Sequence, residues 1–212
     1  MALSVDDEDQ VEALKQWWRE NRVALIGGLT IGVGAIGGWE GWNSWRDGRA
    51  MAASQMYQEL TQAQDSGKSQ AVEEIADKLA SDYSASPYAS GARLRQAQMA
   101  ANQHRYDEAI GHLQWVIDNS KDRGLRQLAG LRMARLLHAQ EKSDQALALL
   151  DQNPGHFLPL YLELRGDILL ATGARESART AYAEALAETG MQAANRSLLE
   201  YKLADLAEGT NS

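Results

Sequence analysis

The stretch from Val23 to Trp39 constrains this chain most, because its seventeen residues carry no charge. Such a length lies near the lower limit for a helix that crosses a bilayer. Five of the six tryptophans flank the stretch, namely Trp17, Trp18, Trp39, Trp42 and Trp45. Tryptophan favours the headgroup level of a membrane, and Trp18 and Trp39 would stand about 32 Å apart along a helix. The sequence therefore predicts a transmembrane anchor over residues 23–45.

Two alternatives to an anchor are a buried core helix and a cleaved signal peptide. A core helix has no need of tryptophan at both ends, or of the six glycines between Gly27 and Gly38. A signal peptide begins with a short basic region and ends at small residues. Here the leading 22 residues are mostly acidic, and the bulky sequence GWEGWNSW closes the apolar run. Both features favour an uncleaved anchor.

Small residues recur every four positions inside the predicted anchor. The candidates for packing against another membrane helix are Ala24, Gly28, Gly32, Gly34 and Gly38. Rows of this kind let two helix backbones approach closely within a bilayer. Glycine is also frequent in membrane helices without any such contact. Packing and mere composition therefore both remain open for these five residues.

Residues 1–22 form an acidic tail, for which we expect a short amphipathic helix that runs into the anchor. Three basic residues precede the anchor, namely Lys15, Arg19 and Arg22. Two follow it closely, Arg46 and Arg49. Cytoplasmic flanks carry the excess of lysine and arginine. The sequence thus predicts, by a margin of one residue, a cytoplasmic N-terminus, with the domain over residues 46–212 on the other side of the membrane.

The composition beyond the anchor is that of an all-α domain. Of the net charge of −8, −4 remains for everything from Arg46 onward, which argues against a nucleic-acid surface. The chain has no cysteine, so disulfides and thiolate metal sites are excluded. Helix-forming alanine, leucine, glutamine and arginine are common. The three prolines lie between the periodic segments rather than inside them.

A pattern of small and large residues repeats along this domain. Ala109, Ala146 and Ala178 lie 37 and 32 residues apart. Twelve residues before each stands a small residue, namely Ala97, Ala134 and Gly166, and four residues after each stands a large one, namely Leu113, Leu150 and Tyr182. Each unit therefore reads as two helices that approach closely, stacked on the next pair. We expect units at about 90–123, 127–158 and 159–192, with a capping helix to about 207.

Turn signals separate the expected helices. A break falls between the two small residues of every unit, in NQHR (102–105), QEKS (140–143) and TGAR (172–175). The sequence Asp65-Ser66-Gly67 ends an earlier helix, so residues 46–85 are expected to pair as a less regular hairpin. Ser86-Pro87 is typical of an N-cap followed by proline at the first helical position. The second helix of the middle unit should stop before Asn153-Pro154-Gly155.

These units resemble the tetratricopeptide repeat, although the early tryptophan of that repeat is missing. The whole layout, with an acidic tail, WWRENRVALIGG, a glycine-rich anchor and YDEAIGHLQWVI within a short array, resembles the YfgM family. Members of that family are ancillary subunits of the bacterial SecYEG translocon. The resemblance implies an inner-membrane protein with a periplasmic repeat domain. It also implies association with the SecYEG translocon and with the membrane-anchored periplasmic chaperone PpiD.

No catalytic or metal-binding motif stands out in the sequence. Its four histidines form neither H-E-x-x-H nor another close pair with metal-ligand spacing. Phosphate-binding and nucleophile-elbow motifs are absent as well. We therefore expect neither an enzyme nor a cofactor.

The resemblance to the tetratricopeptide repeat implies a ligand groove lined by the first helix of each hairpin. With the alanine markers as register, the candidate groove residues are Leu94, Gln98, Asn102, Leu131, Arg135, His138, Leu160, Glu163, Asp167 and Leu170. Alternatively, this face is covered by the helices between residues 46 and 85, or is simply solvated.

The function implied by the family resemblance is a membrane-tethered, protein-binding scaffold associated with the SecYEG translocon. Such a scaffold would help periplasmic chaperones such as PpiD to handle newly translocated proteins, and non-native secreted chains are possible ligands. The alternative is a regulatory scaffold that sequesters a signalling protein through its repeat groove. An enzyme lacks a supporting motif.

Overall fold

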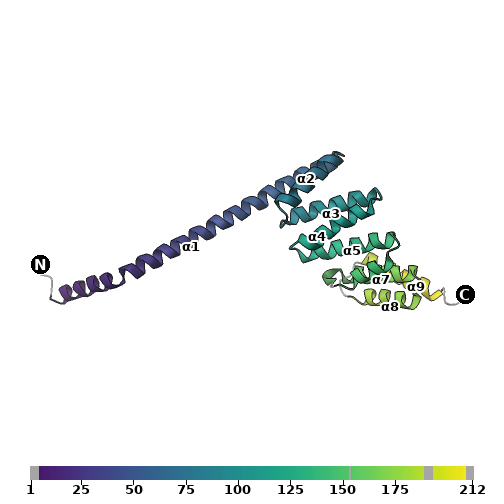
Figure 1. Cartoon of the computed structure of the whole chain (residues 1–212). Coiled ribbons are helices and arrows are strands. Elements are labelled where there is room, and N and C mark those ends of the chain that lie inside the picture. The colour runs from purple at the N-terminus through teal and green to yellow at the C-terminus, as the bar shows by residue number, and fades with distance from the viewer. Residues whose placement is uncertain (1–4, 153, 189–192, 209–212) are drawn as a thin grey trace. The chain divides into compact units, whose positions relative to one another are not determined.

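The computed structural model describes residues 5–152, 154–188 and 193–208, and within these ranges the chain is all-α (Figure 1). Its helices are α1 (Val5–Asp65), α2 (Ser69–Asp82), α3 (Pro87–Asn102), α4 (Tyr106–Asn119), α5 (Arg123–Ala139), α6 (Ser143–Leu150), α7 (Leu158–Ala171), α8 (Arg175–Ala187) and α9 (Ala193–Glu208). A short 3₁₀ helix, η1 (Gly155–Phe157), precedes α7. The predicted fold class, an N-terminal apolar helix followed by a helical repeat domain, is confirmed.

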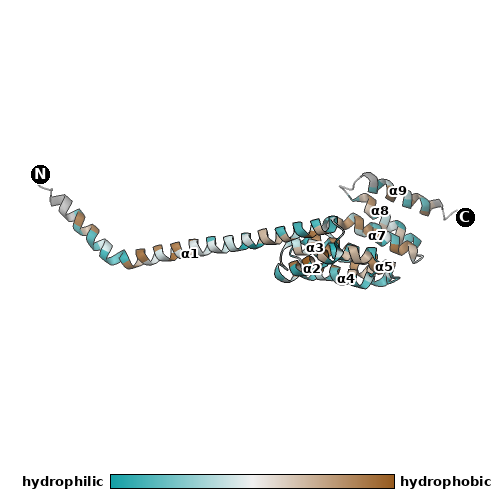
Figure 2. Cartoon of the chain, turned by 90° about the horizontal axis from the view of Figure 1, so that it is seen from above, coloured by the Kyte–Doolittle hydropathy of each residue, from teal (hydrophilic) through white to brown (hydrophobic). Residues whose placement is uncertain are grey.

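The chain divides into two units, Met1–Met51 and Ala52–Ser212, and α1 contributes to both. In the first unit α1 is long and apolar enough to cross a membrane, judged by length and composition. Its large apolar side chains are exposed; Val23, for example, is 77% exposed. Figure 2 shows the hydrophobic residues along this stretch of α1. Of the predicted tail at 1–22, residues 1–4 lie outside the described residues, and the remainder is helical.

The second unit is built from hairpins that turn in the same way. The turns contain a residue with positive φ, at Gly67 (+68°), His104 (+57°), Glu141 (+62°) and Gly173 (+86°). At each turn the N–H of this residue donates to the carbonyl three residues earlier, and the next N–H donates to the carbonyl five residues earlier, over 2.8–3.0 Å. These bonds satisfy carbonyls at the end of the preceding helix. The turns therefore define equivalent positions 37, 37 and 32 residues apart.

In this register the end of α1, together with α2, is a further hairpin of the array, and it is equivalent to α3–α4. The predicted units covered only α3–α4, α5–α6 and α7–α8. Their hairpins begin at Pro87, Arg123 and Leu158, a few residues ahead of the predicted boundaries. The predicted end of the third unit, at residue 192, lies outside the described residues. Figure 1 shows α2, α3, α4 and α5 stacked in chain order, with α7 and α8 beyond α5.

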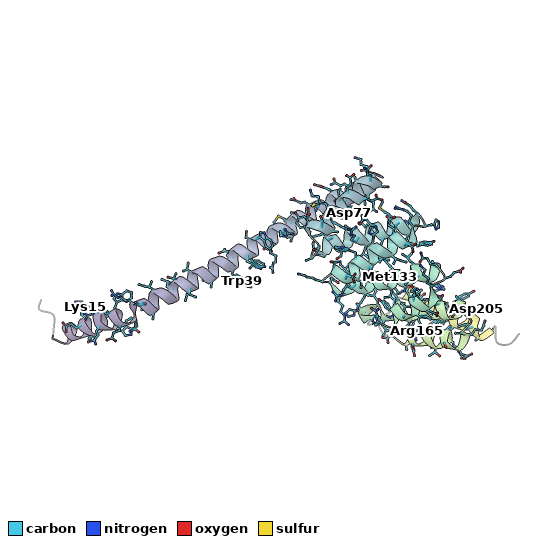
Figure 3. All side chains as sticks on the ribbon, viewed as in Figure 1. Lys15, Trp39, Asp77, Met133, Arg165 and Asp205 are labelled. Atoms are coloured by element: carbon cyan, nitrogen blue, oxygen red, sulfur yellow. The ribbon has the colours of Figure 1, made fainter. Side chains whose placement is uncertain are left out.

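The repeat markers are buried as predicted. Ala109, Ala146 and Ala178 are all fully buried, and their small and large partners in each unit are buried as well. Met133, labelled in Figure 3, packs against the core of the α3–α4 hairpin and also against that of the α5–α6 hairpin. The cores of these two hairpins are thus in contact, and a single hairpin could not form such a shared interior.

Helix ends follow the local sequence signals. The Ser86 hydroxyl accepts a hydrogen bond from the Tyr88 N–H at 3.2 Å, and Pro87 opens α3, which confirms the predicted cap. The Asp122 carboxylate accepts a bond from the Leu125 N–H at 2.9 Å and so caps α5. α6 has only eight residues, whereas α4 has fourteen and α8 has thirteen. It ends at Leu150, ahead of the Pro154-Gly155 turn, as predicted.

The helix α9 covers the last hairpin through a charged cluster as well as apolar contacts. Leu199 and Leu206 of α9 are buried against Tyr182 of α8. The Lys202 ammonium contacts the carboxylates of Glu163 at 2.9 Å and Asp167 at 2.7 Å. Burial alone would lower the pKa of Lys202, but its hydrogen bonds to Asp167 and Glu163 outweigh that effect and raise the pKa.

Candidate protein-binding groove

A pocket of about 270 Å³ lies between α3 and α5. Its lining residues are Ala97, Gln98, Ala101, Asn102, Leu113, Arg132, Arg135 and Leu136. Three of the predicted groove residues, Gln98, Asn102 and Arg135, therefore come together in one place, and all three are exposed. The pocket offers carboxamides, guanidinium groups and an apolar wall.

A second pocket, of about 220 Å³, adjoins the first at Asn102. It lies where the end of α1, the start of α2 and the end of α3 meet, and its other lining residues are Gln64, Gly67, Ser69, Val72, Met99 and Gln103. Asn102 thus stands between two hollows that run across successive hairpins. We call the two pockets together the groove.

The groove has a basic side, which α5 supplies. α5 carries four arginines and one histidine but no acidic residue, and no residue that lines either pocket is acidic. In the part of the chain that the structure describes, Arg132 and Arg135 form no ion pair. Two unneutralised guanidinium groups in one pocket favour an anionic ligand group.

Two of the predicted groove residues belong to the core instead. Leu94 is 7% exposed and Leu131 is 1% exposed. Leu94 lies in a cluster with Ala129 of the next hairpin, and Leu131 lies in a cluster with Leu164 of the hairpin after it. Each leucine is therefore covered by the following hairpin and cannot contact a ligand in the groove. The expectation that they line it is wrong.

The predicted groove residues of the third unit do not join the pocket either. Glu163 and Asp167 are engaged by Lys202 of α9. Leu170 packs against the cluster formed by α8 and α9, and Leu160 packs against the core of the middle hairpin. The capping helix therefore covers this part of the face, where the sequence had suggested the helices between 46 and 85 as a cover.

His138 lies at the edge of this face and bonds within its own hairpin. Its Nδ1 lies 3.2 Å from the Ser143 hydroxyl, and the ring is half-buried. Arg132, by contrast, is a lining residue that sequence reasoning missed. Its equivalent one repeat earlier is Arg95, so the recurrence of arginine 37 residues apart is the signal that could have found it.

Another polar cluster joins α2, α3 and α4 outside the groove. Arg93 donates to the Asp77 carboxylate at 2.7 Å and to Gln96 Oε1 at 2.8 Å, and its guanidinium lies 5.4 Å from the centre of the Trp115 ring. Burial, and then the charge of Arg93, lower the pKa of His112 beside it. This cluster ties three helices together, so its role is structural.

The five small residues of the apolar helix face nothing within their own unit. Ala24 is exposed, and a Cβ built on Gly28, Gly32, Gly34 or Gly38 would meet no atom within 4 Å. At about 100° per residue, Leu29, Val33 and Ile36 fall on the side of the helix away from these five residues, whereas Ile31 falls among them. The small-residue face is thus uncovered within its own unit. Across the described ranges, no group of three or more metal-ligating side chains could hold a metal ion.

Comparison with known proteins places this architecture in a family. Residues 15–208 match the model of the tetratricopeptide repeat-like domain family. A relative from Escherichia coli strain K12, named ancillary SecYEG translocon subunit, is 32% identical over 98% of this chain and 100% of its own length. Relatives of the same name occur in Neisseria gonorrhoeae (30% identical, 97% of this chain, 100% of the relative) and Haemophilus influenzae (28%, 87% and 91%). The chain belongs to this tetratricopeptide repeat-like family, whose named relatives are ancillary SecYEG translocon subunits.

Proposed function

We propose that this protein is a membrane-tethered scaffold that associates with the SecYEG translocon and holds a polypeptide segment in the groove. The names of its relatives support the association. The observation that carries the binding role is the pocket between α3 and α5, where Gln98 and Asn102 face Arg132 and Arg135. No motif or cluster described above supports a catalytic role.

The chemistry of the groove suits an extended chain. A carboxamide both donates and accepts hydrogen bonds, so Gln98 and Asn102 can pair with the N–H and C=O groups of a peptide backbone whatever its sequence. Leu113 and Leu136 add an apolar wall for side chains. The arginines contribute selectivity for charge more than bulk affinity. Together these groups would hold a non-native chain loosely and with little sequence preference.

The location of the repeat domain and its chaperone partner are inferred from the family resemblance and from the basic flanks of the anchor. We propose that the repeat domain lies in the periplasm, where it assists chaperones such as PpiD with newly translocated proteins. An alkaline phosphatase fused after Ser212 should then be active in cells. An inactive fusion, together with an active cytoplasmic reporter at the same position, would reverse the orientation.

The groove itself can be tested in cells by photocrosslinking. A photoreactive phenylalanine analogue at Gln98 should capture polypeptides that the same analogue at Glu184, an exposed residue of α8, does not. Equal capture from both positions, or none from Gln98, would refute the groove as a binding site. Recovery of one defined signalling protein would instead favour a regulatory scaffold.

A further inference from the structure

Arg95 and Arg132 occupy equivalent places in successive hairpins. They lie 37 residues apart, the same interval that separates the left-handed turn residues Gly67, His104 and Glu141. Each arginine stands two residues before the small marker of its helix, Ala97 in α3 or Ala134 in α5. Two successive hairpins thus carry an arginine at the same repeat position, and the neighbours of the two arginines differ.

Between α1 and α3 this arginine is engaged by two side chains of α1. Arg95 Nε donates to the Tyr57 hydroxyl at 3.0 Å, and Arg95 Nη1 donates to Gln64 Oε1. The guanidinium also lies 5.5 Å from the centre of the Tyr57 ring. The helix α1 therefore supplies this guanidinium with two oxygen acceptors and an aromatic face.

Between α3 and α5 the positions equivalent to Tyr57 and Gln64 no longer provide hydrogen-bond acceptors. The residues 37 positions after Tyr57 and Gln64 are Leu94 and Ala101, and neither side chain can accept a hydrogen bond. Ala101 lines the pocket of about 270 Å³, so the short side chain leaves space where the first interval holds a carboxamide. No described residue makes a hydrogen bond or an ion pair with the Arg132 side chain.

Between α5 and α7 the equivalent position holds no arginine. The equivalent of Arg132, two residues before Gly166, is Leu164, which is 7% exposed and lies in the core. At this repeat position, among the described residues, Arg132 is the unengaged guanidinium that lines a hollow. Arg135 adds a second positive charge to the same pocket.

We infer that Arg132 is a subsite for a carboxylate of the bound polypeptide, whose oxygens take the place that Gln64 and Tyr57 fill in the preceding interval. A carboxylate offers two acceptor oxygens and a charge, which match the guanidinium fork better than a neutral amide does. Leu113 and Leu136 would line the aliphatic stem of an acidic side chain. This inference rests on the proposed function and specifies the ligand chemistry of the same groove.

The test uses the full chain in lipid nanodiscs and a set of fluorescent hexapeptides, Gly-Ala-Leu-Glu-Leu-Ala and its Gln counterpart, both amidated. A third peptide, the Gln counterpart with a free C-terminus, distinguishes an α-carboxylate from a side-chain carboxylate as the source. We expect the best carboxylate peptide to bind about tenfold more tightly than the amidated Gln peptide, because charge-assisted hydrogen bonds are roughly twice as strong as neutral ones.

The matched variants are Arg132→Gln and Arg95→Gln. Arg132→Gln should abolish the preference for carboxylate, so that the three peptides bind this variant alike, whereas Arg95→Gln should retain the preference. Added salt should weaken binding of the carboxylate peptide alone.

Equal binding of all three peptides to the unmodified protein would overturn the carboxylate subsite but leave the groove in place. The carboxylate subsite would also be overturned if the preference for carboxylate peptides persisted in Arg132→Gln. The same holds if Arg95→Gln removed that preference too. Absence of binding by every peptide, joined with no photocrosslinking at Gln98, would overturn the proposed function itself.

Discussion

Substituting Gly166 by alanine gives a sharp test of how the last hairpin packs. A Cβ at this position would lie 2.3 Å from Cε1 and 2.5 Å from Cδ1 of the Tyr182 ring. The ring is fully buried, and its hydroxyl donates to Asp167 at 2.7 Å, so it cannot easily retreat. The added methyl group must therefore displace either α7 or the ring.

Two effects of opposite sign decide the outcome. Overpacking a core costs about 1–3 kcal/mol, whereas alanine in place of glycine stabilises a helix interior by about 1 kcal/mol. Because three ring atoms fall within 2.9 Å of the new Cβ, we expect the upper part of that cost. The net loss is then about 1–2 kcal/mol, which lowers the Tm by roughly 2–8 °C for a chain of this size.

The chain supplies a matched control in Gly111 of α4, where a new Cβ meets nothing within 4 Å. Gly111→Ala should raise the Tm of the full chain in detergent, measured by circular dichroism, while Gly166→Ala lowers it. In a Tyr182→Leu background, Gly166→Ala should become neutral or stabilising. If Gly166→Ala raised the Tm as Gly111→Ala does, this account of the packing would be refuted.

Four further predictions concern other parts of the molecule. Ala146→Leu should cost about 1–3 kcal/mol in a thermal melt, because Ala146 is fully buried; an unchanged Tm would contradict the packing at that crossing. His112 has a pKa below 6.5 in the folded chain, so its contribution to stability is present above pH 6.5 and lost as the pH falls through the folded pKa; His112→Gln should flatten that fall in Tm between about pH 7 and pH 5. Lys202→Met should cost about 1–2 kcal/mol in the same melt, less than for a fully buried pair because the lysine is 22% exposed. Gly28→Leu with Gly32→Leu should weaken copurification of membrane partners without preventing insertion, and undiminished recovery would remove the helix-packing role.

The fold was predictable from the sequence at positions where the packing allows only one kind of residue. Helices that cross closely need small side chains, so Ala109, Ala146 and Ala178 gave the register of the last three hairpins. The first hairpin was not recognised as a repeat, because a large residue occupies the position of the small marker. Leu60 lies 37 residues before Ala97, which in turn lies 37 residues before Ala134. Its turn residue, Gly67, carries the shared geometry, but a single glycine in a sequence does not reveal its φ angle.

The groove was only partly predictable, because periodicity tells which residues share a helix face but not what covers that face. Leu94 and Leu131 share a face with Gln98 and Arg135, yet the next hairpin covers the leucines. Charge pairing across distant segments is equally hidden, since Lys202 lies 35 residues from the carboxylate of Asp167. A variant combining Arg135→Glu with Asp167→Lys would therefore perturb the capping helix as well as the groove, and Arg135→Glu alone is the cleaner change.

The brevity of α6 has a consequence for how the domain unfolds. In a linear array each hairpin is coupled only to its neighbours, so cooperativity passes along the chain through successive interfaces. With eight residues, α6 offers the smallest second-helix surface among the last three hairpins. Sub-global opening should therefore separate two folding blocks at this point. We expect amide hydrogens of α7 to α9 to exchange with solvent through an opening that leaves those of α3 and α4 protected.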